Sequence, residues 1–217
     1  RGAARAGTVG LPIDGVEMKL APVADKLEVR FRGPSITPGY WRQPELTAAA
    51  FDEEGYYRTG DAMRFVDPED AAQGFEFDGR LTEDFKLATG TWASVGPLRA
   101  KINAACSPWV QDVVITGHDR DELGALVIPN AIVCKGLSAA ELRARLQPIF
   151  DRLASESTGS SNRIARAMLL ETPPSIDAGE VTDKGSINQR AVLKNRAALV
   201  ERLYAEPPDP SIMIAAT

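Results

Sequence analysis

An aspartate and an arginine in the first half of the chain have side chains suited to binding a phosphorylated sugar. Asp61 follows the segment Tyr-Tyr-Arg-Thr-Gly at residues 56–60, and Arg80 follows a glycine. An aspartate on a glycine turn can accept hydrogen bonds from the vicinal hydroxyls of a ribose, and a planar guanidinium can pair with phosphate or carboxylate. The alternatives are an aspartate that closes a turn with its own backbone, and a surface ion pair of Arg80 with Asp78 or Glu83.

Composition narrows the classes of protein that can use such a site. The chain has 217 residues, a net charge of −5 and 44% hydrophobic residues, which suits one or two globular domains. The acidic balance argues against a general nucleic-acid binder, and no apolar run approaches the roughly 18 residues that span a membrane. The single histidine, His118, excludes a multi-histidine metal site, and Cys106 and Cys134 are expected to be buried free thiols.

Alternating patterns and turn residues predict two structural regions. Residues 7–66 are rich in glycine and proline and carry short alternating runs at 16–20 and 26–32, with one short helix at 46–51. We therefore expect an α+β protein, in which a small β-rich region, a sheet or a barrel, precedes a domain with a short sheet flanked by helices. Beyond the short strand 74–78, the predicted elements are helix 95–106, strands 109–116 and 123–129, a helix from the capping box at Ser138 to 155, strand 165–171, helix 187–204 and an irregular tail from 206.

Several segments resemble known enzymes. The pattern Thr-Pro-Gly-Tyr-Trp to Thr-Gly-Asp over residues 37–61, with residues 7–17, resembles the acyl-CoA synthetases of the adenylate-forming superfamily. The segment 85–92 is similar to the variant in long-chain acyl-CoA synthetases and carboxylic acid reductases. A narrower resemblance, to feruloyl-CoA synthases, is carried by residues 74–80, 113–130 and 181–190.

The resemblance implies the last third of such a synthetase, because the family's phosphate loop ending in Pro-Lys-Gly and its Tyr-Gly-x-Thr-Glu segment do not occur in this sequence. It implies a β-rich, barrel-like subdomain at 1–79, a hinge at 80–83 and a mobile α+β domain at 84–217. The chain begins without Met and is interpreted as the inside of a longer protein. On this view it needs the remainder of the large domain as a partner and is inactive alone.

The resemblance also implies an activity. A carboxylic acid, feruloyl or hydroxycinnamoyl in type, would react with ATP to give an acyl-adenylate, and coenzyme A would then displace AMP. Magnesium would be carried by the phosphates of ATP and not by dedicated residues, and the enzyme would be cytoplasmic, with no nucleic-acid or membrane partner. The alternatives are a ligase for a fatty or benzoate-like acid and a non-catalytic module of the same fold; loading of a carrier-protein thiol is disfavoured.

Site residues follow from the same resemblance. Asp61 and Arg80 would bind the nucleotide, and Thr82 or Glu83 would be the hinge, although family members often have Asp or Lys at the position of Thr82. A loop made of Lys86, Gly90, Thr91 and Trp92 would face the active site during thioester formation. The alternative for this loop is an ordinary strand and turn with Trp92 in the core.

The adenylation lysine is assigned to Lys184. Family members place this lysine in a segment of the type Gly-Lys-Ile-x-Arg, and a gapless overlay puts Ser186 at that position. Lys184 lies two residues earlier, on a predicted flexible loop, where its ammonium can stabilise charge that develops on the α-phosphate. The alternatives are a solvated loop lysine and a role for Arg190 on the following helix.

Overall fold

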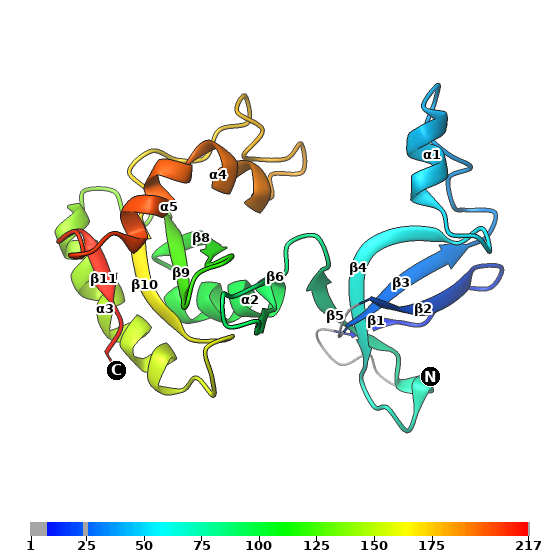
Figure 1. The fold of residues 1–217 in the computed structure, drawn as a ribbon, viewed down its shortest axis with the longest axis horizontal. Coiled ribbons are helices and arrows are strands. Elements are labelled where there is room, and N and C mark those ends of the chain that lie inside the picture. Colours follow the sequence, from blue (N-terminus) through cyan, green and yellow to red (C-terminus); the bar gives the residue numbers. More distant parts are fainter. Residues whose placement is uncertain (1–7, 24–25, 217) are drawn as a thin grey trace. The chain divides into compact units, whose positions relative to one another are not determined.

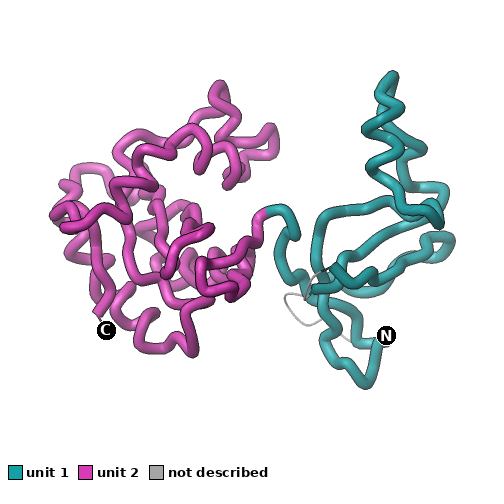
Figure 2. The backbone as a smooth tube through the Cα atoms, viewed as in Figure 1, with its two compact units in different colours: residues 1–82 teal, residues 83–217 magenta. Residues whose placement is uncertain are grey.

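The chain folds into two compact units, which we describe separately. The computed structural model describes residues 8–23 and 26–216, and the boundary of the units lies between Thr82 and Glu83 (Figure 2). We call the part up to Thr82 unit 1 and the part from Glu83 unit 2. Both combine strands with helices, which confirms the predicted α+β class.

Unit 1 is built on a five-stranded antiparallel sheet. Its strand order is β1-β5-β4-β3-β2, so β1 and β2 are its edges (Figure 1). The sequence left a sheet and a barrel as alternatives, and the described residues form an open sheet. The strands are β1 (Thr8–Gly10), β2 (Glu17–Val23), β3 (Lys26–Arg32), β4 (Tyr57–Phe65) and β5 (Phe75–Arg80), with helix α1 (Pro44–Ala50) and the short 3-10 helix η1 (Ala71–Gln73) in the connections.

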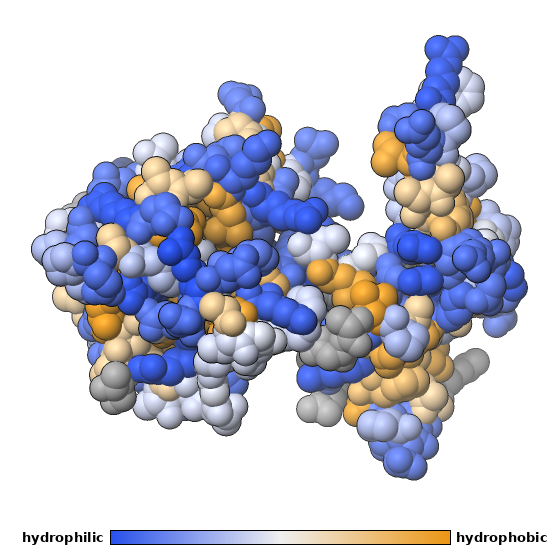
Figure 3. Space-filling model, viewed as in Figure 1, coloured by the Kyte–Doolittle hydropathy of each residue, from blue (hydrophilic) through white to orange (hydrophobic). Residues whose placement is uncertain are grey.

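The core of unit 1 is thin. Among the described residues, Val29, Met63 and Phe75 form its buried apolar cluster, with half-buried neighbours such as Phe31 and Phe65 packed against them. Many large apolar side chains of the unit stay exposed, and apolar surface gathers over its sheet (Figure 3). The described apolar core of this sheet is therefore one small cluster of side chains.

Unit 2 is organised around a four-stranded mixed sheet of order β11-β10-β9-β8. The pairs β8–β9 and β10–β11 are antiparallel, and β9–β10 is parallel. The strands are β8 (Val110–Thr116), β9 (Leu123–Pro129), β10 (Ile164–Leu169) and β11 (Ile212–Ile214), preceded by a hairpin of β6 (Phe85–Lys86) and β7 (Trp92–Ala93). The helices are α2 (Val95–Cys106), α3 (Ala139–Ser155), α4 (Gln189–Asn195) and α5 (Ala197–Tyr204).

Both faces of this sheet are buried, and strand alternation divides the core into two layers. In β9, Ala125 and Val127 belong to the layer that contains α2 and α3, whereas Leu126 and Ile128 belong to the layer that contains α4 and α5. Because side chains of a strand point alternately to opposite faces, a nearly continuous apolar run is what a strand covered by helices on both faces requires.

The structure corrects two predicted elements near the end of the chain. The helix predicted over 187–204 is two helices, because the backbone leaves the helical region at Arg196. The tail expected to be irregular from 206 contains strand β11, which pairs with β10. The predicted capping box is confirmed, since the Ser138 hydroxyl accepts from the Glu141 amide while the Glu141 carboxylate accepts from the Ser138 amide.

Other predictions concern single residues. His118 lies in the β8–β9 loop and is exposed, as expected of a polar hairpin loop. Both cysteines are free; Cys106 is buried and Cys134 is half-buried. Among the described residues, no helix has the length and apolar character that a bilayer crossing demands.

Candidate functional site

Asp61 lies inside strand β4 and not on a turn, which corrects the sequence interpretation. Gly60 has φ of +71° and marks a bulge, with register shifts between β4 and both of its neighbours. A glycine suits this position because the left-handed region strains residues that carry a Cβ atom. The bulge lets a long strand present the Asp61 carboxylate in a local geometry that a regular strand lacks.

The Asp61 carboxylate is not used by its own backbone. The Asp61 amide donates to Oγ1 of Thr59 at 3.0 Å, and the Thr59 hydroxyl donates to the Val29 carbonyl at 2.6 Å. Thr59 therefore satisfies the local backbone, and the Asp61 carboxylate stays available for a partner. This arrangement differs from the alternative of an aspartate that closes a turn with its own chain.

Asp61 and Arg80 are cross-strand partners. They lie directly opposite each other on β4 and β5, with 3.4 Å between Nε of Arg80 and Oδ1 of Asp61. Arg80 therefore pairs with Asp61 and not with Asp78, which contacts Lys26. Both side chains reach solvent, since Arg80 is 62% and Asp61 35% exposed. The structure thus brings together the two residues predicted to bind a nucleotide.

A buried glutamate supports the bulge. Glu28 on β3 is 5% exposed, and its Oε1 accepts a hydrogen bond from the Gly60 amide at 3.0 Å. Its other oxygen accepts from Nε of Arg30 at 2.7 Å, and Arg30 continues the network to Asp52, which also pairs with Lys19. Sequence reasoning missed Glu28, because its place in an alternating strand suggested a solvent-facing residue.

The pKa of Asp61 is raised above the ordinary aspartate value. The main cause is burial, which disfavours the charged carboxylate; Glu28 acts in the same direction and Arg80 acts against it. Burial has removed part of the water around the Asp61 carboxylate. A ligand that donates hydrogen bonds to this carboxylate would therefore stabilise its charged form. Two oxygen acceptors fit two adjacent hydroxyl donors.

The predicted hinge residues lie where the two units meet in the chain. Leu81 and Thr82 follow β5 in a turn, in which the Leu81 amide donates to the Gly60 carbonyl at 2.9 Å. The unit boundary falls between Thr82 and Glu83. A change of backbone angles at a few residues between two compact units is how hinges work, and the hinge role stays a prediction.

The β6–β7 hairpin carries the predicted thioester-face residues. Lys86 and Trp92 are direct cross-strand partners, and the Lys86 ammonium lies 5.2 Å from the centre of the Trp92 ring. Trp92 is half-buried, so it is neither a core residue nor a fully exposed one. Gly90 and Thr91 are exposed at the turn, and a Cβ atom on Gly90 would meet open space. The bare backbone at Gly90, with φ of +81°, allows close approach of a ligand.

A shallow cavity of about 230 Å³ adjoins this hairpin. Trp92 forms part of its wall, together with residues from the start of α2 and from the loop before β10, including Lys101 and Asn162. The Asp84 carboxylate accepts a hydrogen bond from the Val95 amide at 2.8 Å, which fixes the first turn of α2 next to the hairpin.

Lys184 lies at the tip of a tight three-residue loop. Thr182 and Ser186 close the loop, with the Thr182 amide donating to the Ser186 carbonyl at 2.8 Å and the Gly185 amide donating to the Thr182 carbonyl at 2.8 Å. The hydroxyls of Thr182 and Ser186 also lie 2.7 Å apart. Ser186 therefore closes the loop, whereas the Lys184 side chain is exposed and makes no ion pair within the described part of the chain.

A buried ion pair fixes the base of this Lys184 loop. Glu180 is 3% exposed, and its two oxygens accept from Nε and an Nη atom of Arg196 at 2.9 and 2.8 Å. The pKa of Glu180 is lowered by the hydrogen bonds from Arg196. The Glu180 carbonyl also accepts from the Asn188 amide, and Asn188 caps α4. Sequence reasoning missed this pair, because Glu180 precedes the loop and Arg196 lies inside the predicted helix 187–204, and neither position points to the other.

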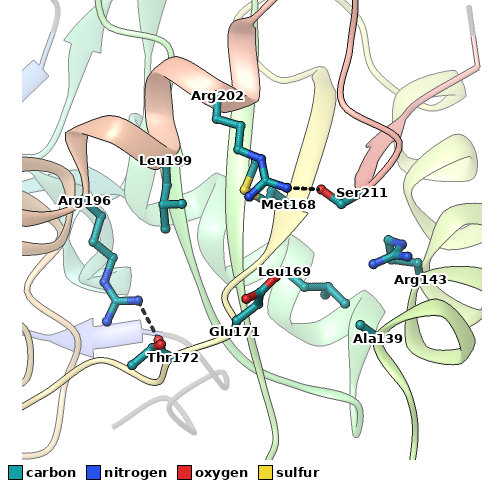
Figure 4. Close-up of a pocket in the computed structure, with 10 residues that line it drawn as sticks. All are labelled: Ala139, Arg143, Met168, Leu169, Glu171, Thr172, Arg196, Leu199, Arg202 and Ser211. Atoms are coloured by element: carbon teal, nitrogen blue, oxygen red, sulfur yellow. Dashed lines mark hydrogen bonds between the residues drawn. The ribbon is translucent and has the colours of Figure 1, made fainter.

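A second cavity of unit 2, of about 150 Å³, is lined by three arginines (Figure 4). Arg196 donates to the Thr172 carbonyl, and Arg202 donates to the Ser211 hydroxyl at 3.2 Å. Arg196 is neutralised by Glu180 and Arg202 by Asp209, so Arg143 is the lining arginine without a carboxylate partner among the described residues. This cavity therefore presents little net positive charge.

The candidate residues fall into separate groups. Asp61 and Arg80 form one group in unit 1; in unit 2, Lys86 to Trp92 form a hairpin and Lys184 a distinct loop. No three His, Cys, Asp or Glu side chains of the described residues lie close enough to hold a metal ion. The first group can accept hydrogen bonds from hydroxyls, the hairpin offers a bare glycine backbone, and the Lys184 loop places a cation.

Comparisons with known proteins agree with this architecture. The chain is 26% identical to a probable acyl-activating enzyme 16, chloroplastic, of Arabidopsis thaliana, over 91% of the chain and 31% of that protein. It is 30% identical to a carboxylic acid reductase of Mycobacterium marinum, over 82% of the chain and 15% of that protein. Among solved structures, the A domain of the carboxylic acid reductase from Segniliparus rugosus, in complex with AMP and a co-purified carboxylic acid, has a TM-score of 0.72 at 26% identity and covers 88% of this chain and 31% of that one.

The chain spans about a third or less of the length of these relatives. Residues 84–207, more than half of the chain, match the family described as AMP-binding enzyme C-terminal domain. The chain thus belongs to the AMP-binding enzyme C-terminal domain family, and with it to the adenylate-forming enzymes.

Proposed function

We propose that the chain is the C-terminal part of an ATP-dependent acid–CoA ligase, acting on a hydroxycinnamic acid such as ferulate. The observation that carries the proposal is the half-exposed Asp61 carboxylate, which Thr59 spares from local backbone bonding and which Arg80 faces across the strand pair. The finer assignment to ferulate is supported by the resemblance of residues 74–80, 113–130 and 181–190 to feruloyl-CoA synthases.

In this proposal, unit 1 binds the nucleotide in both half-reactions. The two oxygens of Asp61 accept hydrogen bonds from the two ribose hydroxyls. These hydrogen bonds are strong because their acceptor is charged. Arg80 contacts the ribose or a phosphate. Because ATP and AMP share the ribose, this contact persists from the adenylation step to the release of AMP.

Lys184 acts in the first half-reaction. A carboxylate oxygen of the acid attacks the α-phosphorus of ATP, the bond from that phosphorus to the bridging oxygen breaks, and pyrophosphate leaves. The Lys184 ammonium stabilises charge on the α-phosphate and on the acid carboxylate as it develops. Its exposed position at a loop tip supports this assignment, because the ammonium has no competing carboxylate among the described residues. Arg190, exposed on α4, is the alternative cation.

The hairpin acts in the second half-reaction. The thiol sulfur of coenzyme A attacks the carbonyl carbon of the acyl-adenylate, the bond from that carbon to the phosphate oxygen breaks, and AMP leaves. A change of backbone angles at Thr82 or Glu83 brings in Lys86, Gly90, Thr91 and Trp92 for this step. The open space over Gly90 supports close approach of the pantetheine arm.

Other acids are the nearest rival within the same chemistry. The relatives described above include an acyl-activating enzyme and carboxylic acid reductases, which favours a broader range of acids than hydroxycinnamates. A non-catalytic module is the rival of a different class, and the observation in its favour is Ser186 at the family's lysine position.

The test is acid-dependent exchange of pyrophosphate into ATP by a full-length enzyme that contains this chain. The acids are ferulate, benzoate and a long-chain fatty acid, each tested with and without coenzyme A, and thioester is measured in the same samples. Our proposal predicts exchange with ferulate well above the other acids, and feruloyl-CoA only when coenzyme A is present. Exchange with the fatty acid alone would refute the ferulate assignment, and no exchange with any acid would favour the non-catalytic module.

A further inference from the structure

The β6–β7 hairpin depends on contacts outside itself. Each of its strands has two residues, and its turn is closed by the Leu87 amide donating to the Thr91 carbonyl and the Gly90 amide donating to the Leu87 carbonyl, both at 2.9 Å. An isolated two-stranded hairpin is marginally stable at best in water. The position of its tip is therefore set by what the hairpin is attached to.

The β8–β9 loop provides the attachment. The Ala88 amide donates to the Arg120 carbonyl at 2.9 Å, and the Asp119 amide donates to the Lys86 carbonyl at 3.2 Å. The rings of Phe85 and His118 also meet edge to face, with centroids 6.2 Å apart. These contacts join the first strand of the hairpin and the start of its turn to a loop that lies about thirty residues further along the chain.

Arg120 connects this loop to helix α5. Its guanidinium pairs with the Glu201 carboxylate and lies 5.1 Å from the centre of the Tyr204 ring. The Tyr204 hydroxyl in turn donates to the Glu122 carbonyl at 3.1 Å, on the other side of the same loop. Within the loop, the Arg120 amide donates to the Gly117 carbonyl at 3.0 Å. Arg120 thus holds the hairpin with its main chain and α5 with its side chain.

We propose that Arg120 is a positioning residue for thioester formation, which holds the tip of the β6–β7 hairpin in place by fixing the β8–β9 loop to α5. The inference rests on the proposed function of the hairpin in the second half-reaction. A small displacement of a group that orients a reactant is costly to its rate, so loss of this connection slows the step that uses the hairpin. The adenylation step, which uses Lys184, keeps its rate.

Arg202, which lies next to Glu201 on α5, offers a matched control. Arg202 pairs with Asp209, as Arg120 pairs with Glu201, and replacing it removes the same charge and a similar exposed ion pair. Within the described part of the chain, the Arg202 guanidinium contacts Asp209 and Ser211 and not the hairpin. Arg120→Lys keeps the charge opposite Glu201, and Glu201→Gln removes that charge from the other side.

The first measurement is hydrogen exchange over residues 85–93 in the 217-residue chain, for wild type, Arg120→Ala, Arg120→Lys, Glu201→Gln and Arg202→Ala. We expect Arg120→Ala to speed exchange of the Ala88 amide at least about tenfold, because protection follows local opening. Glu201→Gln should act in the same direction, Arg120→Lys should restore part of the protection, and Arg202→Ala should match wild type. Unchanged exchange in Arg120→Ala and Glu201→Gln would overturn the proposal whatever the protein's activity is.

The second measurement separates the two half-reactions in the full-length enzyme. Thioester formation from preformed acyl-adenylate should fall about tenfold or more in Arg120→Ala and recover in part in Arg120→Lys, with pyrophosphate release unchanged. An equal loss in both half-reactions, or no loss in thioester formation, would refute the positioning role while leaving the proposed ligase function intact. A wild-type enzyme that releases no pyrophosphate would refute the proposed function, and the positioning role would fall with it.

Discussion

The Asp61 bulge in unit 1 and the Lys184 loop in unit 2 both rest on a buried glutamate, but the glutamates act at different distances. Glu28 accepts a hydrogen bond from the Gly60 amide, so it fixes the backbone next to Asp61 itself. Glu180 pairs with Arg196 at the base of the other loop and leaves Lys184 exposed at the tip. The chain thus holds one candidate group firmly and the other only by its base.

This difference matches the roles proposed for Asp61 in both half-reactions and for Lys184 in one. A group that binds ribose in both half-reactions benefits from a fixed geometry, since a fixed acceptor loses no conformational entropy when the ligand binds. A lysine that acts in one half-reaction must approach and leave, and an exposed loop tip permits that. The two sites therefore share a buried supporting glutamate, whereas the functional side chain of each reaches solvent.

The largest effect is expected from breaking the base of the Lys184 loop. Arg196→Met leaves the buried Glu180 carboxylate without its bidentate partner, and we expect a loss of about 3 kcal/mol in the free energy of unfolding. Urea unfolding of the 217-residue chain, followed by circular dichroism, measures it. Arg202→Met removes an exposed arginine from the neighbouring helix and should cost far less. Equal losses in the two variants would show that the Glu180–Arg196 pair has no special place in this fold.

A smaller effect compares the two glycines beside the candidate groups. Gly60 and Gly185 have φ of +71° and +79°, and at both an added Cβ atom meets open space. Gly60→Ala and Gly185→Ala should therefore each cost about 1 to 2 kcal/mol through backbone strain alone. AMP affinity, measured by calorimetry with the full-length enzyme, should fall in Gly60→Ala and stay unchanged in Gly185→Ala. Equal AMP affinity in both variants would contradict the role of the bulge in presenting Asp61.

The smallest effect is a separation in pH. The raised pKa of Asp61 means that its charged form, the form that would bind ribose in the proposed function, is lost at a higher pH than for an ordinary aspartate. The lowered pKa of Glu180 means that its contribution to stability is present above the unfolded glutamate pKa of about 4.3 and is lost as pH falls through the folded value. As pH falls, AMP affinity should therefore decline at a higher pH than an ordinary aspartate would give, and unit 2 should lose the contribution of Glu180 below about pH 4.3. Titration of both quantities on one buffer series measures the two midpoints, and an AMP affinity that holds down to the ordinary aspartate pKa of about 3.9 would contradict the Asp61 assignment.

The sequence predicted most of the helices and strands, but not which strands and side chains pair with one another. Helix 95–106 and strands 26–32 and 123–129 have the predicted bounds, because each carries a clear period or a continuous apolar run. The break at Arg196 was missed because no residue of the local pattern marks it; the Arg196 side chain pairs there with Glu180, 16 residues earlier in the chain. Strand β11 was missed because three apolar residues after a proline-rich segment give too short a pattern.

The site shows the same limit. Asp61 and Arg80 were singled out by residue type and by family resemblance, yet their position directly opposite each other depends on strand register and on a bulge. Register reflects the packing of the whole sheet and cannot be derived from two short segments. Glu28 was passed over for the same reason, since a glutamate in an alternating strand is most often solvated and only the bulge at Gly60 turns it into a support.

The most direct test is single-turnover pyrophosphate release by the full-length enzyme with ATP and ferulate, for wild type, Lys184→Ala and the control Lys194→Ala. Lys194 is an exposed lysine in the last turn of α4. Thioester formation from preformed feruloyl-adenylate is followed separately. We predict that Lys184→Ala slows pyrophosphate release at least about 100-fold, equivalent to about 2.7 kcal/mol of transition-state stabilisation, and leaves the thioester step and the control unchanged. Normal pyrophosphate release from Lys184→Ala would contradict the central claim and move the role to another cation, with Arg190 the first to replace.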